Sequence, residues 1–110
     1  MNYKRIYTRY IGKLQAKIKN IRNNKENDDI VPGLIYSINF LKNNYKRRSE
    51  KMPKETEQQK NYIYTYAIFS TKRRLWKMLS DDNFECSQGF REGLKYSMKV
   101  LLDTERGERQ

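Results

Sequence analysis

The fold of this chain depends on eight residues near its middle, Tyr62-Ile63-Tyr64-Thr65-Tyr66-Ala67-Ile68-Phe69. Their β-branched and aromatic side chains suit a β-strand on local propensity alone. However, helix formers flank the stretch, Gln58-Gln59-Lys60 before it and Lys72-Arg73-Arg74 after it, with no turn residue between. We therefore predict one long helix over about residues 54–80 with a buried apolar centre, and keep a strand over 62–69 as the alternative.

The segments on either side of this region have the apolar periodicity of amphipathic helices. The earlier stripe is Val31, Leu34, Ile35, Ile38, Leu41 and Tyr45, and the later one is Phe90, Leu94, Met98 and Leu101. These stripes predict helices over about 29–46 and 84–103. Small residues at four-residue spacing, Gly89, Gly93 and Ser97, predict that another helix crosses the later one closely.

Acidic residues and prolines support these boundaries. Carboxylates favour helix N-termini, and they occur at each inferred start: Asp28/Asp29, Glu55/Glu57 and Asp81/Asp82/Glu85. Pro32 suits a first helical turn, and Pro53 indicates a boundary between residues 47 and 54. The charged tail over 104–110, which contains Gly107, is expected to fray.

The first segment predicts a basic amphipathic helix over about residues 3–23. Its expected core stripe is Tyr7, Ile11, Leu14, Ile18 and Ile21, with spacings of four and three. The same spacing is heptad-like and permits a homodimer through this helix. Together the segments predict an all-α fold, with residues 1–110 forming a single-domain antiparallel bundle of three to four helices.

Composition excludes several classes of function. The 110 residues contain no histidine, so the usual Ser-His, Cys-His and zinc sites cannot be built, and we expect no enzyme, metal or cofactor. The one cysteine, Cys86, cannot form an internal disulfide, which favours a cytoplasmic location. No apolar stretch approaches the length of a membrane span, and no membrane partner is expected.

Charge supplies the main functional indication. The net charge is +11, and residues 1–25 contain eight Lys or Arg and no carboxylate. On the expected helix, Arg5, Arg9, Lys13 and Lys17 form a ladder on the outward face that suits a phosphate backbone. A solvated helix face is the alternative interpretation.

Two further clusters combine cations with aromatic rings. One is Tyr45-Lys46-Arg47-Arg48, in which the ring suits base stacking and the cations suit phosphates. The other is Lys72, Arg73, Arg74 and Lys77 around Trp76. We expect Trp76 to pack in the core rather than to form a stacking platform, and we expect the same of Tyr7, Tyr10, Tyr62 and Tyr66.

These features predict a non-enzymatic protein that binds nucleic acid or a nucleoprotein complex through a basic helical surface. In its size, charge and Lys/Asn bias the chain resembles accessory proteins of phages and mobile elements. The alternative is a protein-interaction module, an inhibitor or adaptor whose basic face docks on an acidic protein surface of a larger host or defence complex. No known nucleic-acid-binding motif separates these two hypotheses.

Overall fold

The computed structural model describes residues 1–25, 28–52 and 56–109. In this part the chain forms α1 (Tyr3–Asn24), a 3₁₀ turn η1 (Asp28–Ile30), α2 (Val31–Glu50), α3 (Glu57–Ser80) and α4 (Gln88–Arg109). No β-strand occurs among these residues, and the stretch over 62–69 lies within α3. The all-α prediction is confirmed.

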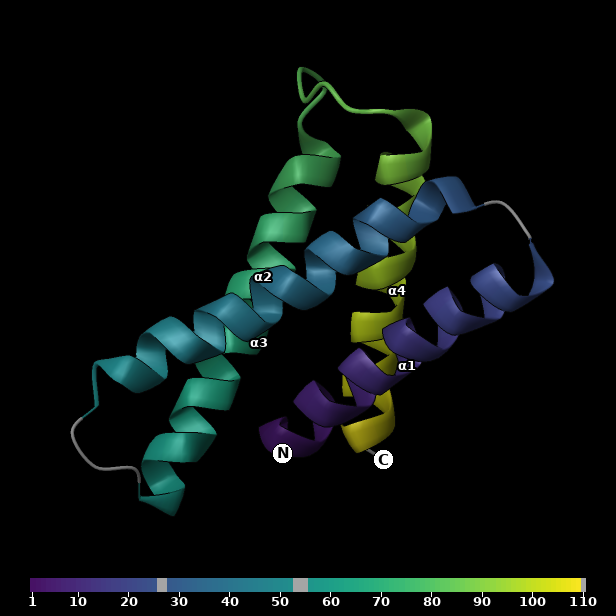
Figure 1. Ribbon diagram of the computed structural model, residues 1–110. Helices are drawn as coiled ribbons and strands as arrows, with labels where there is room; N and C mark the ends of the chain where they lie inside the picture. Colours follow the sequence, from purple (N-terminus) through teal and green to yellow (C-terminus); the bar gives the residue numbers. More distant parts are fainter. Residues whose placement is uncertain (26–27, 53–55, 110) are drawn as a thin grey trace.

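The helices form two antiparallel pairs that cross one another (Figure 1). α1 and α2 run in opposite directions in one pair, and α3 and α4 do so in the other. α2 packs across both α3 and α4, whereas α1 packs mainly on α4 and α3 and less on α2. The two chain termini lie near each other, at the open end of α1 and α4.

Local sequence signals account for the starts of α1, α2 and α3. The Asn2 side chain accepts a hydrogen bond from the Arg5 amide at 3.0 Å and caps α1. Pro32 lies in the first turn of α2 as expected. Thr56 and Gln59 form a reciprocal capping box at the start of α3. The predicted start of this helix at Lys54, with Glu55 in its first turn and Pro53 as the breaker before it, lies outside the described residues.

α2 ends at Glu50, which lies within the boundary predicted between residues 47 and 54 but four residues past the expected helix end at 46. The predicted start of α4 was wrong. α4 begins at Gln88 rather than at 84, because the Ser87 hydroxyl accepts a hydrogen bond from the Phe90 amide and starts the helix there. Asp81 instead folds into a turn, its side chain accepting from the Asn83 amide at 2.9 Å.

The expected frayed tail was also wrong. α4 extends to Arg109, with Thr104 and Glu105 buried, and only Gln110 lies outside the described residues. The carboxylates of this segment pair with cations from α1 and α3, which hold the last turns against the rest of the protein. The charges that suggested solvent exposure are therefore the groups that dock the segment.

The core stripe of α1 differs from the predicted one. Its buried residues are Ile6, Tyr10, Leu14, Ile18 and Ile21, whereas Tyr7 and Ile11 are only partly buried. Since this stripe packs against the other helices of the same chain, it is not free to form a homodimer through α1. In this structure the stripe therefore serves the core of the single chain.

The predicted close crossing of α4 is confirmed, and its partner is α2. A Cβ added to Gly33 would lie 2.8 Å from the Gly93 Cα and 2.5 Å from the Phe90 carbonyl oxygen. A Cβ added to Gly93 would collide with the Ile30 carbonyl oxygen. The two backbones touch here, which requires glycine on both helices.

The centre of α3 is not buried on all sides. Ile63, Ala67, Thr71, Leu75 and Met78 face the core. Three aromatic side chains that we expected to be buried are exposed instead, namely Tyr62 at 47%, Tyr66 at 37% and Trp76 at 64%. α3 therefore has one core face and one exposed aromatic face. Among the helices described here, none combines the length and apolar character that a membrane crossing demands.

Candidate nucleic-acid interface

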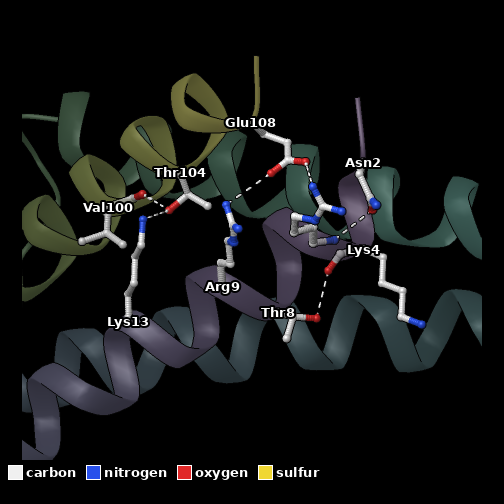
Figure 2. Close-up of polar contacts among 9 residues, drawn as sticks. Asn2, Lys4, Thr8, Arg9, Lys13, Val100, Thr104 and Glu108 are labelled. Atoms are coloured by element: carbon white, nitrogen blue, oxygen red, sulfur yellow. Dashed lines mark hydrogen bonds and ion pairs between the residues drawn. The ribbon is translucent and has the colours of Figure 1, made fainter. Parts of the chain in front are cut away.

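The four cations of the predicted α1 ladder lie at the seam between α1 and α4. Arg5 and Arg9 both pair with Glu108, with Nη1 atoms 3.1 and 3.5 Å from its carboxylate oxygens. The arginine side chains remain 54% and 57% exposed, whereas the Glu108 side chain is 7% exposed. Figure 2 shows Arg9 and Lys13 directed toward the last turns of α4.

The other two ladder residues also contact α4. Lys13 Nζ donates to the Thr104 hydroxyl at 3.0 Å, and that hydroxyl donates to the Val100 carbonyl (Figure 2). Lys17 Nζ lies 5.2 Å from the centre of the Tyr96 ring. Arg5, Arg9 and Lys13 are exposed, as expected of an outward face, but the ladder lies against α4 along its length. Ile6 and Tyr10 replace Tyr7 and Ile11 in the core stripe, whereas Leu14, Ile18 and Ile21 are buried as predicted. The mean direction of the stripe therefore turns by about 40°, which brings the ladder closer to α4.

In the cluster of residues 45–48 at the end of α2, some side chains are packed and others are exposed. The Tyr45 ring packs between Tyr7 and Tyr64, with ring centres 5.5 and 4.7 Å away. Lys46 and Arg47 are exposed and make no hydrogen bond or ion pair within the described part of the chain.

Arg48 crosses from α2 to the exposed aromatic face of α3. Its guanidinium carbon lies 5.4 and 4.5 Å from the ring centres of Tyr62 and Tyr66, and its Nη2 donates to the Tyr62 hydroxyl at 2.7 Å. This hydrogen bond raises the pKa of Arg48, so its charge is permanent. Beside it lies a hollow of about 250 Å³, lined by Asn44, Arg47, Arg48, Lys51 and Tyr66.

The cations of the second cluster, Lys72, Arg73, Arg74 and Lys77, point in different directions around α3. Lys72 turns to α4, where Nζ lies 2.8 Å from the buried Glu105 carboxylate, and Arg74 turns to α2, where Nε donates to the Tyr36 hydroxyl at 3.1 Å. The side chains of Arg73 and Lys77 remain exposed, with no polar partner among the residues that the structure describes. They flank the exposed Trp76.

The exposed residues of α3 recur every three or four positions and so form one continuous face. We call this face the α3 stripe and define it as Tyr62, Tyr66, Phe69, Arg73 and Trp76. No Asp or Glu occurs between residues 58 and 80. The structure joins the two predicted clusters here, because Arg48 of the first covers two rings of the stripe. The spacing of three and four residues was visible in the sequence, but the same spacing also fits a buried helix face, which is what we expected for Tyr62, Tyr66 and Trp76.

Sequence analysis missed a further cationic groove between α1 and α2. Its volume is about 460 Å³, and Ile18, Ile35 and Ile38 contribute its apolar lining. Ile35, expected in the core, is 37% exposed there. The polar lining residues are Gln15, Lys19, Arg22, Asn23, Asn39 and Lys42, and no carboxylate is among them. Cations from two helices therefore surround this groove, but it has no exposed aromatic ring.

The described residues contain no group of three or more His, Cys, Asp or Glu side chains arranged to hold a metal ion. Comparison with known proteins gives no match to a family model, to a curated protein or to a solved structure.

Proposed function

We propose that this protein binds nucleic acid through the end of α2 and the α3 stripe. One observation carries the proposal: the exposed side chains of Arg47, Arg73 and Lys77 have no polar partner among the described residues, and they lie on a surface with several exposed aromatic rings. Cations attract phosphates and release their condensed counterions, while aromatic rings offer contact to bases.

Electrostatics favours this surface over the α1 ladder. A phosphate that contacts Arg73 or Lys77 breaks no ion pair within the described residues. A phosphate that contacts Arg5 or Arg9 competes with Glu108, whose buried carboxylate would lose its partners. The ladder therefore acts mainly as a structural clamp and contributes at most secondary phosphate contacts.

Fluorescence anisotropy of labelled DNA and RNA at several salt concentrations tests the proposal. In the test variant, Arg47, Arg73 and Lys77 are changed to Gln. If all three contact phosphates of a single strand, the slope of log affinity against log salt becomes shallower by about 2. In the matched control, Lys95, Lys99 and Arg106 of α4 are changed to Gln, which removes the same charge elsewhere. We expect the control to retain most of the affinity and slope.

The alternative, docking on an acidic protein surface, predicts a different result. Poly-glutamate would then compete with the labelled nucleic acid as effectively as unlabelled nucleic acid of equal charge does. Equal effects of the two triple variants, or no binding at low salt, would contradict a nucleic-acid interface on α3.

A further inference from the structure

We infer that the α3 stripe is a base-stacking platform and that the bound nucleic acid is single-stranded. This inference rests on the proposed function and specifies the kind of nucleic acid. Bases in a duplex are stacked on one another, so a helix surface cannot reach their faces, whereas unpaired bases can lie flat on exposed aromatic side chains.

Trp76 has the geometry that such stacking needs. Its side chain is 64% exposed, the largest exposure among the large apolar residues of the described chain. Within the described residues no aromatic ring or cation lies over the indole, and Arg73 and Lys77 are its neighbours on the helix surface. A base on the indole would thus have two unpartnered cations close to its phosphates.

The other rings of the stripe extend this platform along α3. Tyr62 and Tyr66 lie in contact with the Arg48 guanidinium, and Phe69 lies 4.9 Å from Lys72 Nζ. Because a cation covers one face of each of these rings, a base could stack only on the opposite face, and the indole of Trp76 is the main stacking site. From Tyr62 to Trp76 the stripe spans about 21 Å of helix, enough for several nucleotides.

Exposure of these rings is costly unless a partner covers them. Four large apolar side chains of the stripe are exposed on one helix face, whereas the other exposed large apolar residues, Met1, Ile35 and Leu102, lie on different helices or at the terminus. Continuous exposed apolar patches on monomeric proteins indicate binding surfaces. The absence of carboxylates between residues 58 and 80 makes an anionic partner the complementary one.

The chain supplies its own reporter, because Trp76 is the only tryptophan. We would titrate the protein with a 15-nucleotide oligothymidylate, an abasic oligomer of the same length and a hairpin duplex. Tryptophan emission of the protein reports stacking, and the anisotropy of a fluorescent label on each oligomer reports binding. We expect the oligothymidylate alone to quench the emission and to bind at least tenfold more tightly than the abasic oligomer.

Variants separate stacking from charge. We expect Trp76→Ala to weaken oligothymidylate binding by roughly 5- to 100-fold and Trp76→Phe to restore part of it, as a ring contact requires. Leu102→Ala, which removes an exposed apolar side chain from α4, should leave affinity unchanged. Far-UV circular dichroism checks that each variant is folded.

The outcomes distinguish this inference from the function on which it rests. Equal binding of all three probes without quenching would overturn the stacking platform and leave charge-driven nucleic-acid binding intact. Failure of every probe to bind at low salt would overturn both. Quenching of the wild-type emission by the oligothymidylate, together with affinities that fall from wild type to Trp76→Phe and further to Trp76→Ala, would establish the platform.

Discussion

Tyr10 places a hydroxyl group in the core of the protein. The side chain is fully buried, and its hydroxyl faces those of Ser37 and Ser97, which are also fully buried. Burial raises the pKa of Tyr10 well above 10.0, although the two serine hydroxyls oppose the shift. The folded state therefore holds this proton more tightly than the unfolded state does.

This shift predicts a contribution to alkaline unfolding. Because the pKa is raised on folding, the stability linked to Tyr10 is complete below pH 10.0 and is lost as pH rises above that value. We expect Tyr10→Phe to change neutral stability by less than about 1 kcal/mol and to make the melting temperature fall less steeply at alkaline pH. Melting curves of both proteins from neutral to alkaline pH would check this, and parallel curves would contradict it.

Glu108 gives a second prediction at the scale of one residue. Its buried carboxylate holds two half-exposed arginines of α1, so solvent screens part of the attraction. We expect Glu108→Gln to lower the free energy of unfolding by about 1 kcal/mol. The matched control is Glu92→Gln, since Glu92 pairs with Lys95 on the exposed face of α4, and it should cost less than about 0.5 kcal/mol. Denaturant titration compares them, and equal losses would show that the α1 clamp has no special role.

At the scale of elements, the crossing of α2 and α4 allows the sharpest test. Gly93→Ala forces a methyl group into the α2 backbone and should destabilise the protein by about 3 kcal/mol. Gly12→Ala is the control, because nothing lies within 4 Å of the added Cβ, and it should stabilise α1 by about 0.5–1 kcal/mol. Thermal unfolding measures both, and a neutral Gly93→Ala would mean that the helices separate easily.

The existence of each helix was predictable, but the rotation of each helix about its axis was not. Caps, Pro32 and apolar spacing are local signals, and they placed α1 to within a residue at its end. In contrast, Tyr7 and Ile11 have the same spacing as Ile6 and Tyr10, so only packing with other helices decides which pair is buried. The same ambiguity hid the exposed face of α3, whose apolar residues occur on every side.

At the scale of the whole molecule, ion pairs between residues far apart in the sequence decide which cations of the candidate site are available to a ligand. The charges of the α1 ladder looked unopposed because their carboxylate, Glu108, is 103 residues away from Arg5 in the chain. Lys72 likewise meets Glu105 only in the folded structure. The residue types of the site were thus predictable, but the division between paired and available cations depends on tertiary contacts.

The junction of Tyr7, Tyr45 and Tyr64 brings together three rings from α1, α2 and α3, with centres 4.7 to 5.5 Å apart. Illumination with an added photosensitiser and persulfate as the electron acceptor removes one electron and one proton from each phenol. Neighbouring tyrosyl radicals of this junction should then couple through a carbon–carbon bond between their rings. Peptide mass spectrometry should find dityrosine links between these helices in monomeric protein. Tyr36, whose described ring neighbours are Phe40 and Phe90, should stay unlinked. Tyrosine rings that pack together in the native fold would thus allow covalent cross-links between α1, α2 and α3.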